Sequence, residues 1–212
     1  MPIRPVSPAA LVNLVVERAI AARTGDWSRV LVDGAPAAAP ERWAERVVEG
    51  LAALGRPVVH VRAEDFLRPA SLRFEHGRTD PDAFSTNWLD ESGLCRTVLA
   101  PLGPGGDGRI VTSLWDSQRD RATRAPFVPV PPGGVCLVSG SLLLGGLLPA
   151  ELTVHLVMSS AVLEHRTDPG LRWTLPAFAR YEQEVAPAGW ADVVAKVDHP
   201  DRPALLRDAD LE

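Results

Sequence analysis

The chain has 212 residues, 46% of them hydrophobic and 23% charged, which is enough for one domain with a substantial buried core. Its net charge of −5 argues against a nucleic-acid or an anionic-membrane partner, because both favour a basic face. The cysteines, Cys95 and Cys136, show neither metal-ligand spacing nor a disulfide framework, so we expect a reducing, cytoplasmic environment. No run approaches the roughly 18 apolar residues that a membrane span needs.

Hydrophobic periodicity predicts an N-terminal amphipathic helix at 8–22, followed by the elements of a sheet. Short apolar runs rich in β-branched residues indicate buried parallel strands at 30–32, 58–61, 135–138, 152–158 and 190–197. Helical patterns separate these runs at 41–54, around 88–99 and at 175–185. This alternation predicts an α/β, doubly wound, mainly parallel sheet in a single domain over 1–212.

The stretch between the second and third core strands, about 63–134, is too long for a simple crossover. It contains Pro- and Gly-rich turns, such as P-L-G-P-G-G at 101–106. We expect it to fold over one edge of the sheet as a substrate-covering insertion.

The segment 29–54 has the order strand, tight loop, helix, which is the setting of a phosphate-binding loop with the pattern G-x-x-x-x-G-K-[ST]. Gly34 supplies the first glycine, and the last three positions hold Ala39, Pro40 and Glu41. The lysine that neutralises phosphate and the hydroxyl that binds Mg²⁺ are therefore absent from these positions. The dipole of the following helix favours the Glu41 carboxylate, which could occupy the anion site and would repel a triphosphate. The alternative is that Pro40 and Glu41 are simply a good helix start.

Two acidic residues, Glu64 and Asp65, follow the second predicted strand. Ligands of open α/β sheets bind outside the carboxyl ends of the strands, so these carboxylates are candidates for general acid–base work. The alternative is a helix cap or an ion pair with Arg62 or Arg68.

Taken in order and spacing, several segments resemble the uridine kinase-like P-loop kinases, particularly their short bacterial members, over nearly the whole chain. The segments are V-D-G at 32–34, A-E-D-F-L-R-P at 63–69, D-P-D-A-F at 80–84, L-W-D at 114–116, V-S-G at 138–140 and the arginine-bearing stretch at 165–180. The resemblance implies the fold of that family, with a lid at about 163–182.

The resemblance also implies roles for particular residues. By position Glu64 would be the general base toward an acceptor hydroxyl, with Asp65 beside it, and Thr79 stands where the family has an acid that holds the ribose. The substrate-pocket candidates are Arg68, Thr79, Asp80, Phe84, Trp115, Asp116 and Arg119. Trp115 could stack on a flat ring or instead cover a small core in the insertion. Arg119, with Arg121 and Arg124, could meet an anionic ligand or be solvated loop charge.

Ser139 stands where the family has an acid that orders Mg²⁺ and water, so a second metal-supporting position has changed together with Glu41. In the lid, Arg166 and Arg172 could reach phosphate-like charge, or they are surface arginines of the segment. The histidines show no metal-binding spacing, and we expect no metal site.

Three hypotheses about function follow. In the first, the chain is not an efficient ATP-dependent kinase and keeps its cleft for a nucleoside-like or other small ligand, or for altered chemistry. In the second, it phosphorylates uridine or a related hydroxyl compound with ATP and Mg²⁺, with Glu64 as base and the lid arginines in place of the lysine. In the third, it is a structural or regulatory partner with a vestigial cleft. We expect a small-molecule ligand and no resident cofactor unless the second holds. The sequence predicts no particular oligomeric state.

Overall fold

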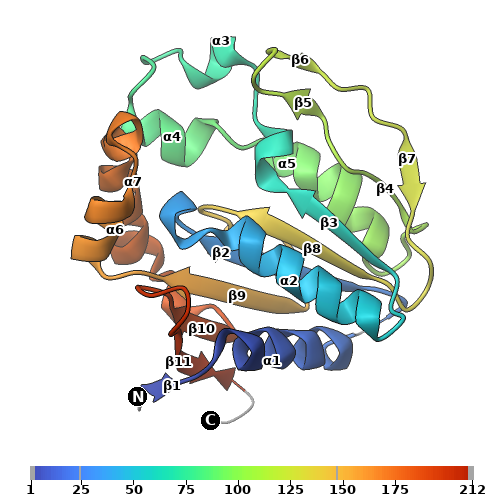
Figure 1. Cartoon of the computed structure of the whole chain (residues 1–212). Helices are drawn as coiled ribbons and strands as arrows, with labels where there is room; N and C mark the ends of the chain where they lie inside the picture. Colours follow the sequence, from blue (N-terminus) through green and yellow to red (C-terminus); the bar gives the residue numbers. More distant parts are fainter. Residues whose placement is uncertain (1–2, 24, 147, 210–212) are drawn as a thin grey trace.

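The computed structural model describes residues 3–23, 25–146 and 148–209. Within these residues, seven strands form one sheet in the order β1-β11-β10-β9-β2-β8-β3 (Figure 1). Their bounds are β1 Arg4–Pro5, β2 Ser28–Gly34, β3 Val58–Arg62, β8 Val135–Gly140, β9 Leu152–Val157, β10 Val193–Lys196 and β11 Ala204–Asp208. The strands from β3 to β10 in this order pair in parallel, whereas β11 and β1 are antiparallel additions at the edge. The predicted α/β, mainly parallel sheet is confirmed.

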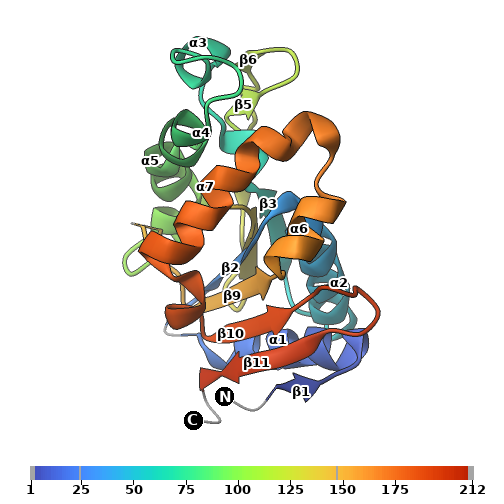
Figure 2. The same ribbon diagram turned by 90° about the vertical axis from the view of Figure 1, so that its left-hand side faces the viewer.

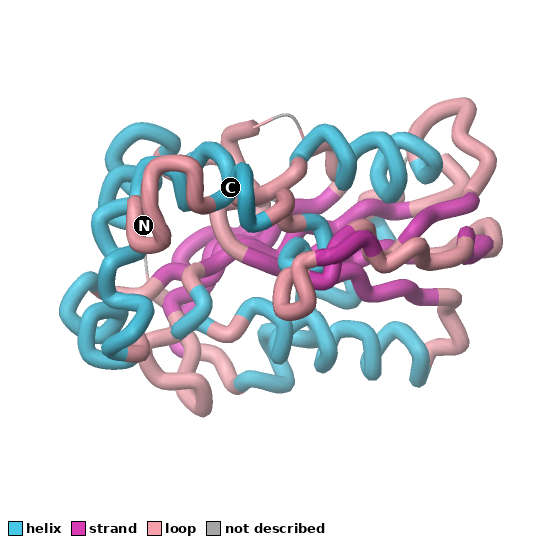
Figure 3. Tube along the Cα trace, turned by 90° about the horizontal axis from the view of Figure 1, so that it is seen from above, coloured by secondary structure: helices cyan, strands magenta, loops and turns pink. Residues whose placement is uncertain are grey.

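Helices cover both faces of the sheet (Figure 3). Side chains alternate across β2, so Val30 and Val32 join the core beneath the N-terminal helices while Leu31 joins the core on the other face. The first core lies under α1 (Pro8–Ala21) and α2 (Pro40–Ala53). The second core lies under the insertion. β2 is buried at every residue because it has a helical layer on each side.

Helix α1 begins where the sequence places a capping residue and a proline. The Ser7 side chain accepts a hydrogen bond from the backbone N–H of Ala10 at 3.1 Å, and Pro8 occupies the first turn. The helix packs against α2 at Gly50, where an added Cβ would lie 2.9 Å from Val16. Gly50 therefore allows the two helices to approach closely.

The insertion after β3 folds over one face of the sheet, at the top and right of Figure 1. Its short helices are η2 Ala63–Phe66, α3 Ala70–Arg73, α4 Pro81–Asn87, α5 Glu91–Leu94, the π-helical turn η3 Cys95–Leu99 and η4 Ala100–Leu102. Two small antiparallel pairs complete it, namely β4 Arg109–Val111 with β7 Phe127–Pro129 and β5 Trp115–Asp116 with β6 Arg121–Ala122.

The lid follows β9 and crosses the carboxyl edge of the sheet (Figure 2). It consists of α6 Ser160–Arg166, η5 Pro169–Thr174, α7 Leu175–Arg180 and the π-helical turn η6 Tyr181–Val185. An ion pair of 2.5 Å between Arg180 of the lid and Asp82 of α4 joins the lid to the insertion. Among the described residues, no helix is long and apolar enough to cross a membrane.

Some predicted boundaries were wrong. The last parallel strand begins at Val193 rather than at residue 190, because the chain first makes the turn η7 (Pro187–Gly189) and leaves Trp190 68% exposed. The helix expected around 88–99 begins at Glu91, because Asp90 caps it. Strands β1 and β11 were not predicted.

Candidate functional site

A cavity of about 410 Å³ lies at the carboxyl edge of the sheet, between the loop after β2, the insertion and the lid. Its floor is the end of β8 with Ser141 and Leu142, and its walls come from η2, α4, α5 and η5. Three predicted site residues line it, namely Glu41, Glu64 and Phe84. Its volume is in the range of small-molecule sites, and its position is that of ligand sites in open α/β sheets.

The loop after β2 folds as a short 3₁₀ helix, η1 (Pro36–Ala38), before α2 begins. The backbone N–H of Ala38 donates to the carbonyl of Ala35 at 2.8 Å, and that of Ala39 donates to the carbonyl of Pro36 at 2.9 Å. Ala39 takes the left-handed conformation, with φ of 54°, at the position of the second motif glycine. Pro36 and Pro40 have no N–H, so these two prolines and the bonded Ala38 and Ala39 offer no free backbone donor in this loop.

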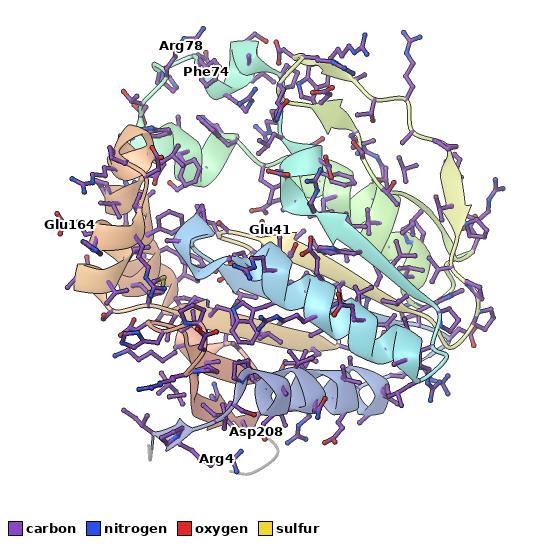
Figure 4. The ribbon with its side chains drawn as sticks, viewed as in Figure 1. Arg4, Glu41, Phe74, Arg78, Glu164 and Asp208 are labelled. Carbon is purple, nitrogen blue, oxygen red and sulfur yellow. The ribbon has the colours of Figure 1, made fainter. Side chains whose placement is uncertain are left out.

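Glu41 lies in the first turn of α2 and lines the cavity (Figure 4). Burial raises the pKa of its carboxyl group, its own backbone N–H acts in the opposite direction, and the nearby Glu64 raises the pKa further. The carboxylate is therefore at the helix N-terminus, in a partly dehydrated place beside a second acid.

Glu64 and Asp65 both contact Arg62, at the end of β3. Glu64 Oε1 lies 2.9 Å from the guanidinium, and Asp65 accepts a hydrogen bond from Arg62 Nε at 3.1 Å. That hydrogen bond raises the pKa of Arg62. Glu64 lines the cavity and Asp65 does not. Glu64 thus forms the ion pair with Arg62 and is also part of the cavity wall.

Aromatic rings form the wall of the cavity between the insertion and the lid. The ring centroid of Phe84 lies 5.2 Å from that of Trp88 and 5.6 Å from that of Trp173, and the two Trp rings lie 5.6 Å apart. All three residues line the cavity. Neither Trp88 nor Trp173 was predicted as a site residue, because they are far apart in the sequence and meet only when the lid packs on α4.

The other substrate-pocket candidates lie outside this cavity. Trp115 Nε1 donates to Asp120 at 3.0 Å within the small β5–β6 hairpin, where the Asp116 side chain accepts from the backbone N–H of Arg119. Asp80 caps α4 by accepting from the backbone N–H of Ala83. Arg68, Thr79 and Arg119 do not line the cavity either. The backbone N–H of Arg68 donates to the Trp88 carbonyl, and Thr79 and Arg119 are exposed.

Of the two lid arginines, Arg166 lies at a different cavity and Arg172 lies at neither. Arg166 lines a second cavity, of about 340 Å³, on the outer side of the loop, together with Arg42 and Arg46 of α2 and the η1 residues Ala37 and Ala38. Arg172 is exposed in η5 and does not line it. Of the described residues, three arginines and one acid, Asp201, thus line this second cavity, and arginine side chains are suited to phosphate and carboxylate groups.

A buried polar network lies between the sheet and the lid, and the sequence reasoning missed it. His155 of β9 contacts Asp33 of β2 through Nδ1 at 2.8 Å and Glu182 of the lid through Nε2 at 3.3 Å. Tyr181 donates to the same Asp33 oxygen at 3.0 Å and accepts from the backbone N–H of Leu144. Burial alone would lower the pKa of His155, but its bonds to Asp33 and Glu182 raise it to about 9. A cavity of about 330 Å³ under the lid borders this network.

At the end of β8, Ser139 is fully buried and paired with a neighbouring strand. Its Oγ lies 2.8 Å from Nε2 of His60 in β3, and burial lowers the pKa of that histidine. The position that carries a metal-ordering acid in the resembled family is thus part of a Ser–His hydrogen bond here. Among the described residues, no group of three or more His, Cys, Asp or Glu side chains is arranged to hold a metal ion.

Comparison with solved structures finds the same fold in two proteins described as possible kinases. A possible uridine kinase from Bacillus stearothermophilus is similar with a TM-score of 0.70 and 14% identity, over 88% of this chain and 97% of that one. A candidate fructose transport system kinase from Silicibacter sp. TM1040 gives a TM-score of 0.58 and 24% identity, over 87% of this chain and 93% of that one. No protein-family model and no curated protein matches the chain. The likeness shows the α/β fold of the uridine kinase-like P-loop kinases, as the sequence predicted.

Proposed function

We propose that the chain uses a uridine kinase-like frame to bind a nucleoside-like or other small ligand, and that it is not an efficient ATP-dependent kinase. The observation that carries this proposal is the 410 Å³ cavity beside the loop 34–41, with Glu41 in its wall. A cavity of this size with apolar and aromatic walls and a few polar groups is typical of a small-molecule site.

The loop itself supports the part of the proposal that concerns ATP. Binding of a triphosphate on such a loop depends on outward N–H groups, a lysine and a metal-binding hydroxyl. Here the N–H groups of Ala38 and Ala39 are used within the turn, Pro40 replaces the lysine, and Glu41 brings negative charge. These residues do not fit a Mg²⁺-bound triphosphate.

A second candidate function, phosphate transfer from ATP to a small hydroxyl compound, is favoured by one observation. Arg166 gathers with Arg42 and Arg46 in the cavity on the outer side of the loop. In this alternative these side chains take over the charge of the missing lysine, and Glu64 acts as the base.

Thermal shift and calorimetry distinguish the candidates, first with Mg·ATP and then with uridine and other nucleosides alone. The proposal predicts nucleoside or small-ligand binding without Mg·ATP binding. Turnover of uridine with micromolar Mg·ATP binding would contradict it and favour the second candidate. If neither kind of ligand binds, a structural or regulatory role is left.

Two variants test whether ligand binding depends on the cavity. Trp173→Leu should weaken ligand binding by about tenfold, because base–aromatic contacts contribute about 1–3 kcal/mol per ring. Glu75→Gln, on the exposed surface after α3, is the matched control and should bind as the wild type does.

A further inference from the structure

The wall of the 410 Å³ cavity has an unusual charge for a kinase-like fold. Glu41, Glu64 and Glu91 come from three different elements and all line it. The described residues of its wall include no Lys, Arg or His side chain. Arg62, outside the wall, pairs with Glu64 and also with Asp65. The charged side chains of the described wall residues are therefore all acidic.

The hydroxyl groups of the wall add acceptors rather than donors. Each of them already donates its proton to a backbone carbonyl, at 2.7–2.9 Å; they are Ser85, Thr86, Ser141 and Thr174. A hydroxyl that has donated its proton presents lone pairs to a ligand. The indole N–H of Trp88 also donates, to the Arg73 carbonyl. Of the two indole N–H groups in the wall, that of Trp173 is therefore the one left for a ligand. The side chains of the wall thus offer mainly acceptors, which suit a ligand that donates hydrogen bonds.

The aromatic rings favour a positive charge as well. Faces of Trp and Phe attract cations through the ring quadrupole. The outer part of the same cluster already holds one cation, because the Arg73 guanidinium lies 5.2 Å from the centroid of the Trp88 ring. The rings and the carboxylates thus both favour a positive ligand, and the hydroxyls favour one that donates hydrogen bonds.

We propose that this cavity binds a small organic cation, with an ammonium or amidinium head near Glu41, Glu64 and Glu91 and a flat or apolar body against Phe84, Trp88 and Trp173. This inference rests on the proposed function, since it names the class of ligand for the same cleft. A phosphate-bearing ligand is disfavoured there by three carboxylates. Burial raises the pKa of Glu41, and a bound cation would offset the cost of that dehydrated carboxylate.

The experiment compares ligands that differ only in charge, by titration calorimetry up to about 1 mM. One pair is 5′-amino-5′-deoxyuridine and uridine, and the other is tryptamine and tryptophol. We expect the amine to bind about tenfold more tightly than its hydroxyl partner in at least one pair, and less tightly as salt is added. Equal binding, or tighter binding of the hydroxyl compounds, overturns the charge inference and leaves the proposed function standing. No binding of any of the four overturns both.

Variants test whether the cavity carboxylates cause the preference. Glu64→Gln and Glu91→Gln should each reduce the ratio of amine to hydroxyl affinity. Glu49→Gln, on the exposed side of α2, is the matched control and should keep the full ratio. A preference that survives replacement of Glu64 and Glu91 together would contradict the assignment of the cation to this place.

Discussion

His155 is buried between two carboxylates that belong to different parts of the chain, Asp33 of β2 and Glu182 of the turn after α7. Tyr181, next to Glu182, also donates to Asp33. A protonated imidazole therefore attracts the lid toward the sheet. Since pairing outweighs burial and raises the pKa of His155 to about 9, it carries its charge at neutral pH.

This pairing predicts how the free energy of unfolding depends on pH. The folded protein holds the His155 proton more tightly than the unfolded chain, whose imidazole has its ordinary pKa of 6.5. The added stability is complete below pH 6.5 and is lost as the pH rises to about 9, in total on the order of 3 kcal/mol. Urea unfolding at a series of pH values measures it.

Glu182→Gln provides the matched test because this side chain is 47% exposed and should be replaced without unfolding the core. Loss of one carboxylate should lower the pKa of His155 in the folded protein, so the decline in stability should still begin near pH 6.5 but should end at a lower pH and be smaller in total. Glu184→Gln, two residues further on and also exposed, should leave the decline unchanged. Identical pH profiles for wild type and Glu182→Gln would refute the role of the pair.

At the scale of elements, the loop after β2 ends in a left-handed residue that is not glycine. Ala39, with φ of 54°, retains the backbone bend of a phosphate loop without its usual residue. Ala39→Gly should stabilise the protein by about 0.5–1 kcal/mol, because relief of the left-handed strain exceeds the entropy that Gly costs.

Ala38→Gly is the control for that substitution, since Ala38 is buried one residue earlier in η1 and its methyl group packs in the first core. It should destabilise by about 1 kcal/mol. Denaturant unfolding of both variants gives the comparison, and a destabilised Ala39→Gly would show that the loop is not strained at this residue.

The elements themselves were largely predictable from periodicity. Runs such as V-L-V in β2 and V-C-L-V in β8 are apolar because both faces of the strands are covered, and such runs are visible in a sequence. Strand β11 was missed because its pattern is mixed, with Arg207 and Asp208 beside Leu205, as is usual for a strand near an edge. Trp190 misled the prediction because it is apolar yet exposed.

The site was less predictable, because it depends on contacts between distant segments. Glu41 and Glu64 were found from their place after core strands, and both line the cavity. Trp173 was not found, since nothing in its own segment indicates that the lid packs against α4. The Asp33–His155 pair had a usable signal, because each is an ionisable residue inside an apolar strand.

At the scale of the whole molecule, we propose that the fold shared with the uridine kinase-like structures is combined with altered chemistry at the carboxyl edge of its sheet. The sheet, the insertion and the lid enclose a cleft in the usual place of an α/β ligand site. Around that cleft, Pro40 and Glu41 follow the loop, and Ser139 contacts His60. The cavity wall includes three acids, Glu41, Glu64 and Glu91. In our proposal, the loop residues and the acids disfavour a triphosphate and favour a ligand that binds without one.

Calorimetric titration of the wild-type protein with Mg·ATP tests this account most directly. We predict no binding heat up to about 1 mM, in a sample that does respond to a small ligand of the cavity. Saturable binding of Mg·ATP with a micromolar Kd would contradict the central claim, because it would mean that the loop 34–41 still holds a triphosphate.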